Sequence, residues 1–149
     1  MSSLHPAPAR PGLPAALVAG RIVAIGRRLP SSRAEAVAGA LADAGVTAFE
    51  ITLNAPVDDA LAGIALCARR FGDRMRVGAG TVRSIADARR AIEAGATFLV
   101  SPHTDVALVR WAAERGIATF PGAFTPTEIV TAWDAGATAV KLFPAPPGP

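Results

Sequence analysis

The sequence predicts an α/β fold with parallel strands, of the barrel type rather than an open sheet covered on both faces. From residue 21 onward, short apolar runs alternate with longer segments in which Ala, Leu, Arg and Glu recur at helical spacing. Strands that alternate with helices form parallel units with right-handed crossovers. Some of the runs also carry polar side chains at alternate positions, which suits a barrel interior better than a face covered by helices.

The elements follow in order. Residues 1–20 form a proline-rich leader, predicted to be flexible and to end in a short helical turn at 14–19. Residues 21–149 are predicted to form one partial barrel domain of about six parallel strands and five to six helices. The predicted strands are 21–26, 47–53, 75–80, 97–102, 117–122 and 138–144.

Glycines end most of the helical segments between these runs. A glycine just past a helix adopts positive φ without steric cost. From Gly95 to Gly116 to Gly136 the spacing is about twenty residues, the length of one strand, one helix and two tight connections. The sequence predicts such helix ends at Gly45, Gly95, Gly116 and Gly136.

Two polar residues lie on the face of their strands that is expected to point inward. In the run at 48–54, large apolar residues alternate with polar ones, and Glu50 lies on the polar face. In the last run, Lys141 lies on the face opposite to Val140 and Leu142. Both side chains are therefore expected inside the barrel, near the C-terminal ends of strands, where barrels of this type place catalytic groups.

This pair of residues suggests imine chemistry. Lys141 is the only lysine in the chain. An ammonium withdrawn from water has a lowered pKa, which leaves an amine that can attack a carbonyl. A carboxylate in the same interior, such as Glu50, could transfer the protons. Two structural alternatives stay open: a lysine that extends to solvent at a strand end, and a glutamate that only pairs with a basic residue.

Composition argues against several other classes. The net charge is +3, but the arginines are scattered singly or in pairs and there is no tyrosine, so no nucleic-acid patch is indicated. No apolar run is long enough for a membrane span. The single cysteine, Cys67, excludes an internal disulfide and favours a reducing, cytoplasmic setting. The two histidines, His5 and His103, are far apart in sequence, so no metal site and no cofactor is expected.

Five stretches together carry a family resemblance: FEITLNAP, VGAGTV, LVSPH, FPGAFTPTE and AVKLFPA, in order between about residues 21 and 145. The chain resembles the class I aldolases that cleave 2-keto-3-deoxy-6-phosphogluconate (KDPG) or its galactonate epimer, a family that includes 4-hydroxy-2-oxoglutarate (KHG) aldolases. The resemblance implies a (β/α)8 TIM barrel, a homotrimer, no cofactor, and a phosphorylated 2-keto sugar acid as the small-molecule partner.

The resemblance also implies roles for individual residues. Lys141 matches the Schiff-base lysine and Glu50 the residue that shuttles protons. Thr81 matches a residue that binds the substrate carboxylate beside the turn at Gly80, and Arg27 an arginine that contacts an anionic end of the substrate. The residues that match the pocket walls are Pro102, Pro121, Thr125 and Phe143.

Some of these residues have structural alternatives. Thr81 and Thr125 could instead be helix caps, and the prolines could shape loops. His103 is expected at the same rim, in a loop or capping role.

Asn54 departs from the gluconate pattern. The gluconate enzymes usually have an arginine at this position, four residues after the glutamate. The asparagine resembles the galactonate branch instead, so the galactonate epimer is the favoured substrate.

Six runs are two fewer than an eight-stranded barrel requires. The chain is therefore expected to lack the last two βα units and to leave its first and last strands as open edges. Three hypotheses remain: a Schiff-base aldolase, a non-catalytic remnant or interaction module of the same fold, and a nucleic-acid binder, for which the sequence offers no positive indication.

Overall fold

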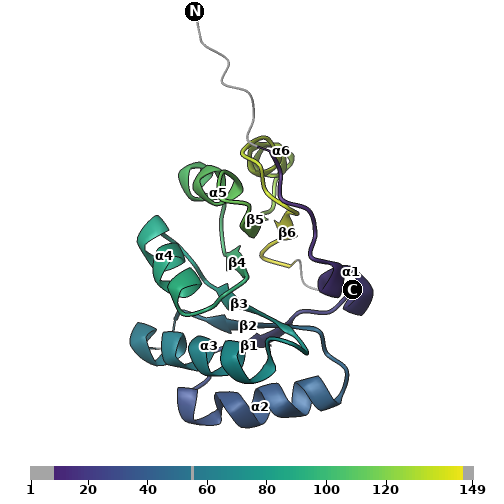
Figure 1. The fold of residues 1–149 in the computed structure, drawn as a ribbon. Helices are drawn as coiled ribbons and strands as arrows, with labels where there is room; N and C mark the ends of the chain where they lie inside the picture. Colours follow the sequence, from purple (N-terminus) through teal and green to yellow (C-terminus); the bar gives the residue numbers. More distant parts are fainter. Residues whose placement is uncertain (1–8, 55, 146–149) are drawn as a thin grey trace, which may run out of the picture.

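The computed structural model describes residues 9–54 and 56–145 (Figure 1). In this part of the chain, strands and helices alternate as the sequence predicts. The elements are α1 (Ala15–Gly20), β1 (Ala24–Gly26), α2 (Ser31–Asp43), β2 (Ala48–Thr52), α3 (Val57–Phe71), β3 (Arg76–Gly80), α4 (Ile85–Glu93), β4 (Phe98–Ser101), α5 (Val106–Ala113), β5 (Ala118–Ala123), α6 (Pro126–Asp134) and β6 (Lys141–Leu142).

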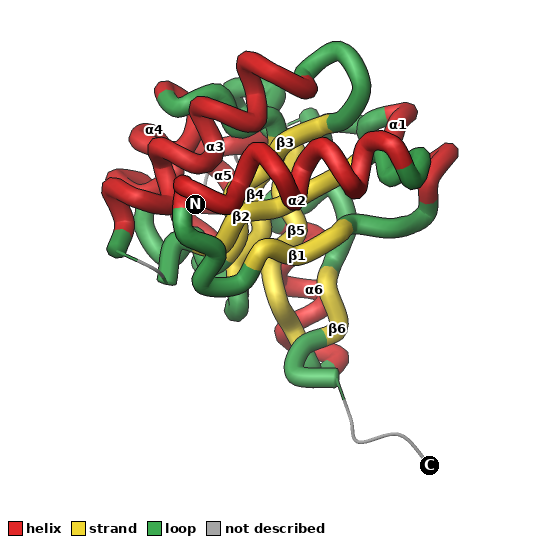
Figure 2. The backbone as a smooth tube through the Cα atoms, turned by 90° about the horizontal axis from the view of Figure 1, so that it is seen from below, coloured by secondary structure: helices red, strands yellow, loops and turns green. Residues whose placement is uncertain are grey.

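The six strands form one parallel sheet in the order β1-β2-β3-β4-β5-β6. The sheet curls into a half-barrel, with helices α2 to α6 along its outer side and α1 near the opening (Figures 1 and 2). This architecture confirms the predicted fold class, with about six parallel strands. Strands β1 and β6 are the two edges of the sheet in the described residues, as expected.

The helix ends agree with the glycine pattern. All four predicted closing glycines have positive φ, between 68° and 103°. Strand β1 begins at Ala24 rather than at residue 21, because Arg21 caps helix α1 in the left-handed conformation (φ 55°). Strand β6 is also shorter than predicted, with only Lys141 and Leu142 in register with β5.

The main apolar core lies on the side of the sheet that the helices cover. Phe49 and Ile51 of β2 pack in the apolar cluster beneath the helices. Helix α2 contributes Ala34, Ala38 and Ala42, and these small side chains bury one face of the helix. Because alternate residues of a strand point to opposite sides, the residue between Phe49 and Ile51 faces the concave interior.

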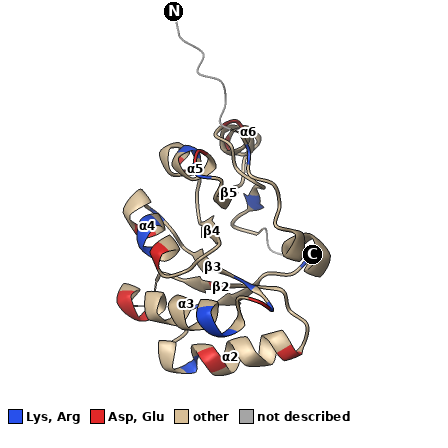
Figure 3. Ribbon diagram, viewed as in Figure 1, with Lys and Arg blue, Asp and Glu red and all other residues tan. Residues whose placement is uncertain are grey.

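Charged residues of the helices lie mainly on the outside of the half-barrel (Figure 3). The ion pairs of the described residues all involve arginine, as in Arg70–Glu35 and Arg74–Asp43, and all are solvent-exposed. Exposed pairs of this kind contribute about 0–1 kcal/mol each to stability. Among the described residues, none of the helices has the length and apolar character needed to cross a membrane.

The close approach of β5 to the turn after β4 gives a first prediction. A Cβ at Gly122 would lie 2.3 Å from the carbonyl oxygen of Pro102, a backbone atom that cannot rotate away. We expect Gly122→Ala to lower the free energy of unfolding by about 1–3 kcal/mol, measured by urea denaturation. Gly39→Ala is the matched control: its Cβ would meet Phe71 at an ordinary 3.6 Å, and alanine in a helix should stabilise by about 0.5–1 kcal/mol. Equal effects of the two substitutions would contradict this packing.

Candidate active site

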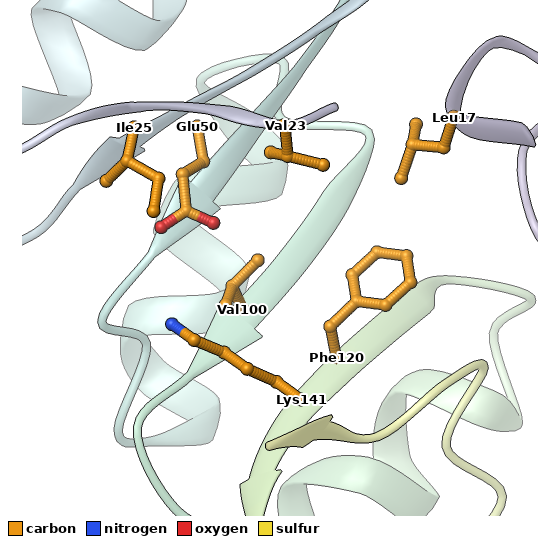
Figure 4. Close-up of a pocket in the computed structure, with 7 residues that line it drawn as sticks. All are labelled: Leu17, Val23, Ile25, Glu50, Val100, Phe120 and Lys141. Atoms are coloured by element: carbon orange, nitrogen blue, oxygen red, sulfur yellow. The ribbon is translucent and has the colours of Figure 1, made fainter. Parts of the chain in front are cut away.

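A cavity of about 200 Å³ lies against the concave face of the sheet. Its walls are apolar except for one carboxylate and one amine (Figure 4). The lining residues come from α1, from β1 and the segment before it, and from β2, β4, β5 and β6: Leu17, Val23, Ile25, Glu50, Val100, Phe120 and Lys141.

Glu50 supplies the carboxylate. The residue is 4% exposed, and its strand partner in β3 is Gly78. A Cβ at Gly80 would lie 2.5 Å from Glu50 Oε1, so a larger residue there would displace the carboxylate from its present position. Burial raises the pKa of Glu50 above its ordinary value, while the positive charges of Lys141 and Arg27 act in the opposite direction.

Lys141 supplies the amine. It lies on β6 opposite Gly122 of β5, and its side chain extends through the cavity toward Glu50 (Figure 4). The Nζ atom is 4.7 Å from the ring centre of Phe143, a cation–π contact. Among the described residues, the ion pairs do not include Glu50 or Lys141, so the two charges interact across the cavity rather than in direct contact.

The other predicted site residues are distributed around this cavity. Pro102 and Phe143 line a second pocket of about 450 Å³ at the rim, together with His103. Pro121 is buried in β5 and lines neither pocket. The remaining lining residues of the rim pocket are Thr104, Gly122, Ala123, Phe124, Glu128 and Pro144.

The capping alternatives for the two threonines have different outcomes. Thr125 is the N-cap of α6, in a capping box with Glu128, which confirms that alternative. For Thr81 the capping alternative is wrong, because Ser84 caps α4. Thr81 instead directly follows β3 with φ 59°, an uncommon conformation for a β-branched residue. The proposed binding roles of both threonines stay predictions.

The loops after β1 and β2 hold Arg27 and Asn54, and both residues are exposed. The Thr52 hydroxyl connects these loops. It donates a hydrogen bond to Asn54 Oδ1 at 2.6 Å and accepts one from the Arg28 N–H at 3.3 Å. Arg27 lines neither pocket, yet its charge lowers the pKa of Glu50.

None of the apolar residues that line this cavity was predicted from the sequence as a site residue. Alternation along β4 and β5 could have identified Val100 and Phe120, because each lies two residues from another residue of the same face. No comparable signal exists for Leu17, since its position depends on how α1 packs. Thr47 fixes that packing with a hydrogen bond from its hydroxyl to the carbonyl of Ala16, at 2.7 Å.

Two further observations concern chemistry away from the cavity. Cys67 is buried in the helix-side core, and burial raises the pKa of its thiol to about 11. A thiol of this kind is chemically inert at neutral pH. Across residues 9–54 and 56–145, no three side chains of the His, Cys, Asp or Glu type gather as a metal site.

Fold and site together define a parallel α/β half-barrel of the TIM-barrel type, with an amine and a carboxylate facing one apolar cavity. Comparison with known sequences specifies the family. The family model "KDPG and KHG aldolase" matches residues 14–147, and the chain belongs to this family.

Individual relatives agree with this assignment. A protein of Rhizobium meliloti named a probable 2-dehydro-3-deoxy-6-phosphogalactonate aldolase is 42% identical over 124 residues, covering 83% of this chain and 58% of the relative. The 2-dehydro-3-deoxy-6-phosphogalactonate aldolase of Escherichia coli is 36% identical over 123 residues, covering 83% and 59%. A 2-dehydro-3-deoxy-phosphogluconate aldolase of Pseudomonas aeruginosa is 37% identical over 111 residues, covering 73% and 48%. The chain therefore spans about half to three fifths of the length of these relatives.

Solved structures show the same fold. The structure titled "Native KDPGal structure" superposes with a TM-score of 0.77 at 35% identity, covering 83% of this chain and 59% of that one. A KDPG aldolase from Legionella pneumophila, with pyruvate captured as a covalent carbinolamine, superposes with a TM-score of 0.79 at 28% identity, covering 88% and 62%.

The buried carboxylate gives a prediction about pH. Because folding raises the pKa of Glu50, the folded chain holds its proton more tightly than the unfolded chain, and stability falls as pH rises through the pKa of the folded state. Below the ordinary value of 4.5 both states are protonated and this cost disappears. The difference in Tm between Glu50→Gln and the unmodified chain should therefore grow in favour of the variant from pH 4 to pH 8.

Glu93→Gln is the matched control, because Glu93 lies on the exposed surface of α4 and its replacement also removes one negative charge. If the Tm difference for Glu50→Gln is independent of pH, or if Glu93→Gln reproduces it, the carboxylate is not desolvated as described.

Proposed function

We propose that this chain carries the catalytic pair of a Schiff-base (class I) aldolase, which cleaves a 2-keto-3-deoxy-6-phospho sugar acid to pyruvate and glyceraldehyde 3-phosphate. The observation that carries the proposal is the single cavity shared by Lys141 and Glu50. Membership of the KDPG and KHG aldolase family supports the reaction class. Captured pyruvate in the Legionella pneumophila relative supports covalent chemistry at a 2-keto carbon.

The reaction begins when Nζ of Lys141 attacks the 2-keto carbon and forms a carbinolamine. Loss of water from the carbinolamine gives an imine. Glu50 then accepts the proton of the C4 hydroxyl, the C3–C4 bond breaks, and its electron pair moves through the enamine toward the imine nitrogen. Glyceraldehyde 3-phosphate leaves as the aldehyde. Protonation of the enamine at C3 and hydrolysis of the imine release pyruvate and restore the amine.

The environment of Glu50 suits this proton transfer. A general acid–base group works best when its pKa lies near the working pH, and burial moves the pKa of Glu50 in that direction. The nearby amine and guanidinium limit the rise, so the carboxylate form stays accessible. The carboxylate can therefore accept a proton at one step and return it at a later one.

The substrate is proposed to be of the galactonate type. Support comes from Asn54 in place of an arginine and from the galactonate aldolases among the relatives. Arg27, Thr81 and the Gly80 amide are proposed to bind the carboxylate, with Pro102 and Phe143 at the pocket wall. Pro121 and Thr125 are the remaining residues of the proposed pocket wall.

We further propose a cytoplasmic homo-oligomer, a trimer as the family resemblance implies. The exposed apolar side chain of Leu142 on β6 and the unpaired edges of β1 and β6 in the described residues support association. They also favour the second candidate function, a non-catalytic interaction module that associates through these edges.

Covalent trapping separates the two candidates. After incubation with pyruvate and borohydride, we expect one reduced adduct per chain, located at Lys141 by peptide mapping. Lys141→Ala should abolish the adduct, because no other lysine exists and only the N-terminal amine could substitute. Glu50→Gln should still be trapped, with turnover slower by about 10²–10⁴-fold, the usual contribution of acid–base catalysis.

Circular dichroism of each sample establishes that it is folded. An adduct that survives Lys141→Ala would refute the assignment of the nucleophile. A folded, unmodified chain without any adduct would refute the aldolase proposal and leave the interaction module.

A further inference from the structure

Residues 9–14, here called the strap, run between the two ends of the half-barrel. In Figure 1 this segment passes beside α6, the last helix, and continues to α1 at the opening. Helix α1 in turn is fixed to the start of β2 through the hydrogen bond between Thr47 and Ala16. The strap therefore joins elements that lie at opposite ends of the strand order.

Arg10 attaches the strap to α6. Its Nε donates a hydrogen bond to the carbonyl of Ala137 at 2.9 Å, and its terminal nitrogen donates one to the carbonyl of Trp133 at 2.8 Å. Its guanidinium carbon also lies 3.4 Å from the centre of the Trp133 ring. Arg10 thus adds side-chain donors and positive charge at the C-terminal end of α6, where the helix dipole is negative.

The elements that Arg10 contacts are weakly held otherwise. Ala132 is the only buried residue of α6. The packing around it is a small cluster separate from the main core, made largely of alanines such as Ala135 and Ala137. Strand β6 adds two residue pairs with β5. Few buried apolar contacts and few ladder pairs mark a region that opens locally before the rest of the chain.

We propose that Arg10 is a positioning residue: it closes the half-barrel through the strap and holds α6 and β6 so that Lys141 faces Glu50. Lys141 follows Ala137 by four residues, so the chain that Arg10 holds leads directly into the strand that carries the amine. The attachment of the strap to α6 is inferred from contacts between described residues alone. Its effect on the reactivity of Lys141 is inferred from the proposed aldolase function as well.

Hydrogen exchange measured by mass spectrometry tests the strap. In Arg10→Ala, amides of residues 132–142 should exchange about tenfold faster, the fold-change that corresponds to about 1.4 kcal/mol, while amides of β2 and β3 keep their rates. Arg10→Lys keeps the charge and one donor group, and should recover part of the protection. If Arg10→Ala does not fold, the comparison of Arg10→Lys with the unmodified chain decides the question in the same way.

Arg115→Ala is the matched control. Arg115 also stacks on a tryptophan, at 4.8 Å from the Trp111 ring, and also donates to a backbone carbonyl, that of Trp111 at 2.9 Å. Its contacts stay within one helical segment, so exchange at 132–142 should not change. Unchanged exchange in Arg10→Ala, or an increase spread evenly over the whole chain, would overturn the strap.

Trapping by pyruvate and borohydride tests the effect on the amine. Well below the Tm of both variants, Arg10→Ala should form the Lys141 adduct several-fold more slowly, with partial rescue by Arg10→Lys and no effect of Arg115→Ala. Faster exchange at 132–142 with an unchanged trapping rate would overturn the positioning role. Absence of trapping in the unmodified chain would instead refute the proposed function. The hydrogen-exchange rates of residues 132–142 would still show whether Arg10 holds α6 and β6.

Discussion

The site depends on one packing constraint: beside Glu50 and Thr52, the concave face of β3 carries two glycines and no side chain. Gly78 and Gly80 both lie on that face, opposite Glu50 and Thr52 of the neighbouring strand. A Cβ at Gly80 would reach the Glu50 carboxylate at 2.5 Å, and one at Gly78 would reach the ring of Phe98 at 2.3 Å. The two glycines thus provide the volume in which a buried carboxylate and a large aromatic ring fit side by side.

The amine and the carboxylate both extend from the concave side of the sheet into one cavity. They lie on β2 and β6, four positions apart in the sheet, and only the curl of the sheet brings them to one cavity. The Phe98 ring packs edge-to-face on Phe120, with ring centres 5.8 Å apart, and fills the interior beneath them. Stability is unevenly distributed around this interior, because the main core supports β2 firmly whereas β6 rests on a small alanine-rich cluster. The proposed nucleophile therefore lies in the weaker half of the fold.

Much of this arrangement could be predicted from sequence, because periodicity reports local structure directly. Alternation placed Glu50 and Lys141 on inward faces, and the closing glycines located the helix ends. Boundaries that depend on tertiary contacts could not be predicted: Arg21 shortens β1 because it caps α1, and Pro121 lies in the sheet away from both pockets. The contact of Arg10 with α6, between residues more than 120 positions apart, has no signature in local sequence.

Glu50 and Lys141 share one poorly solvated cavity, and the charge of the amine acts on the carboxylate there. The most direct test is a carbon-13 NMR titration of the Glu50 carboxyl, in the unmodified chain and in Lys141→Met, which replaces the amine with an apolar side chain of similar length. We expect a pKa above the ordinary glutamate value in the unmodified chain. We expect a still higher pKa in the variant, because the charge of Lys141 lowers the pKa of Glu50. An ordinary pKa in the unmodified chain, or the same pKa with and without the amine, would contradict the shared cavity.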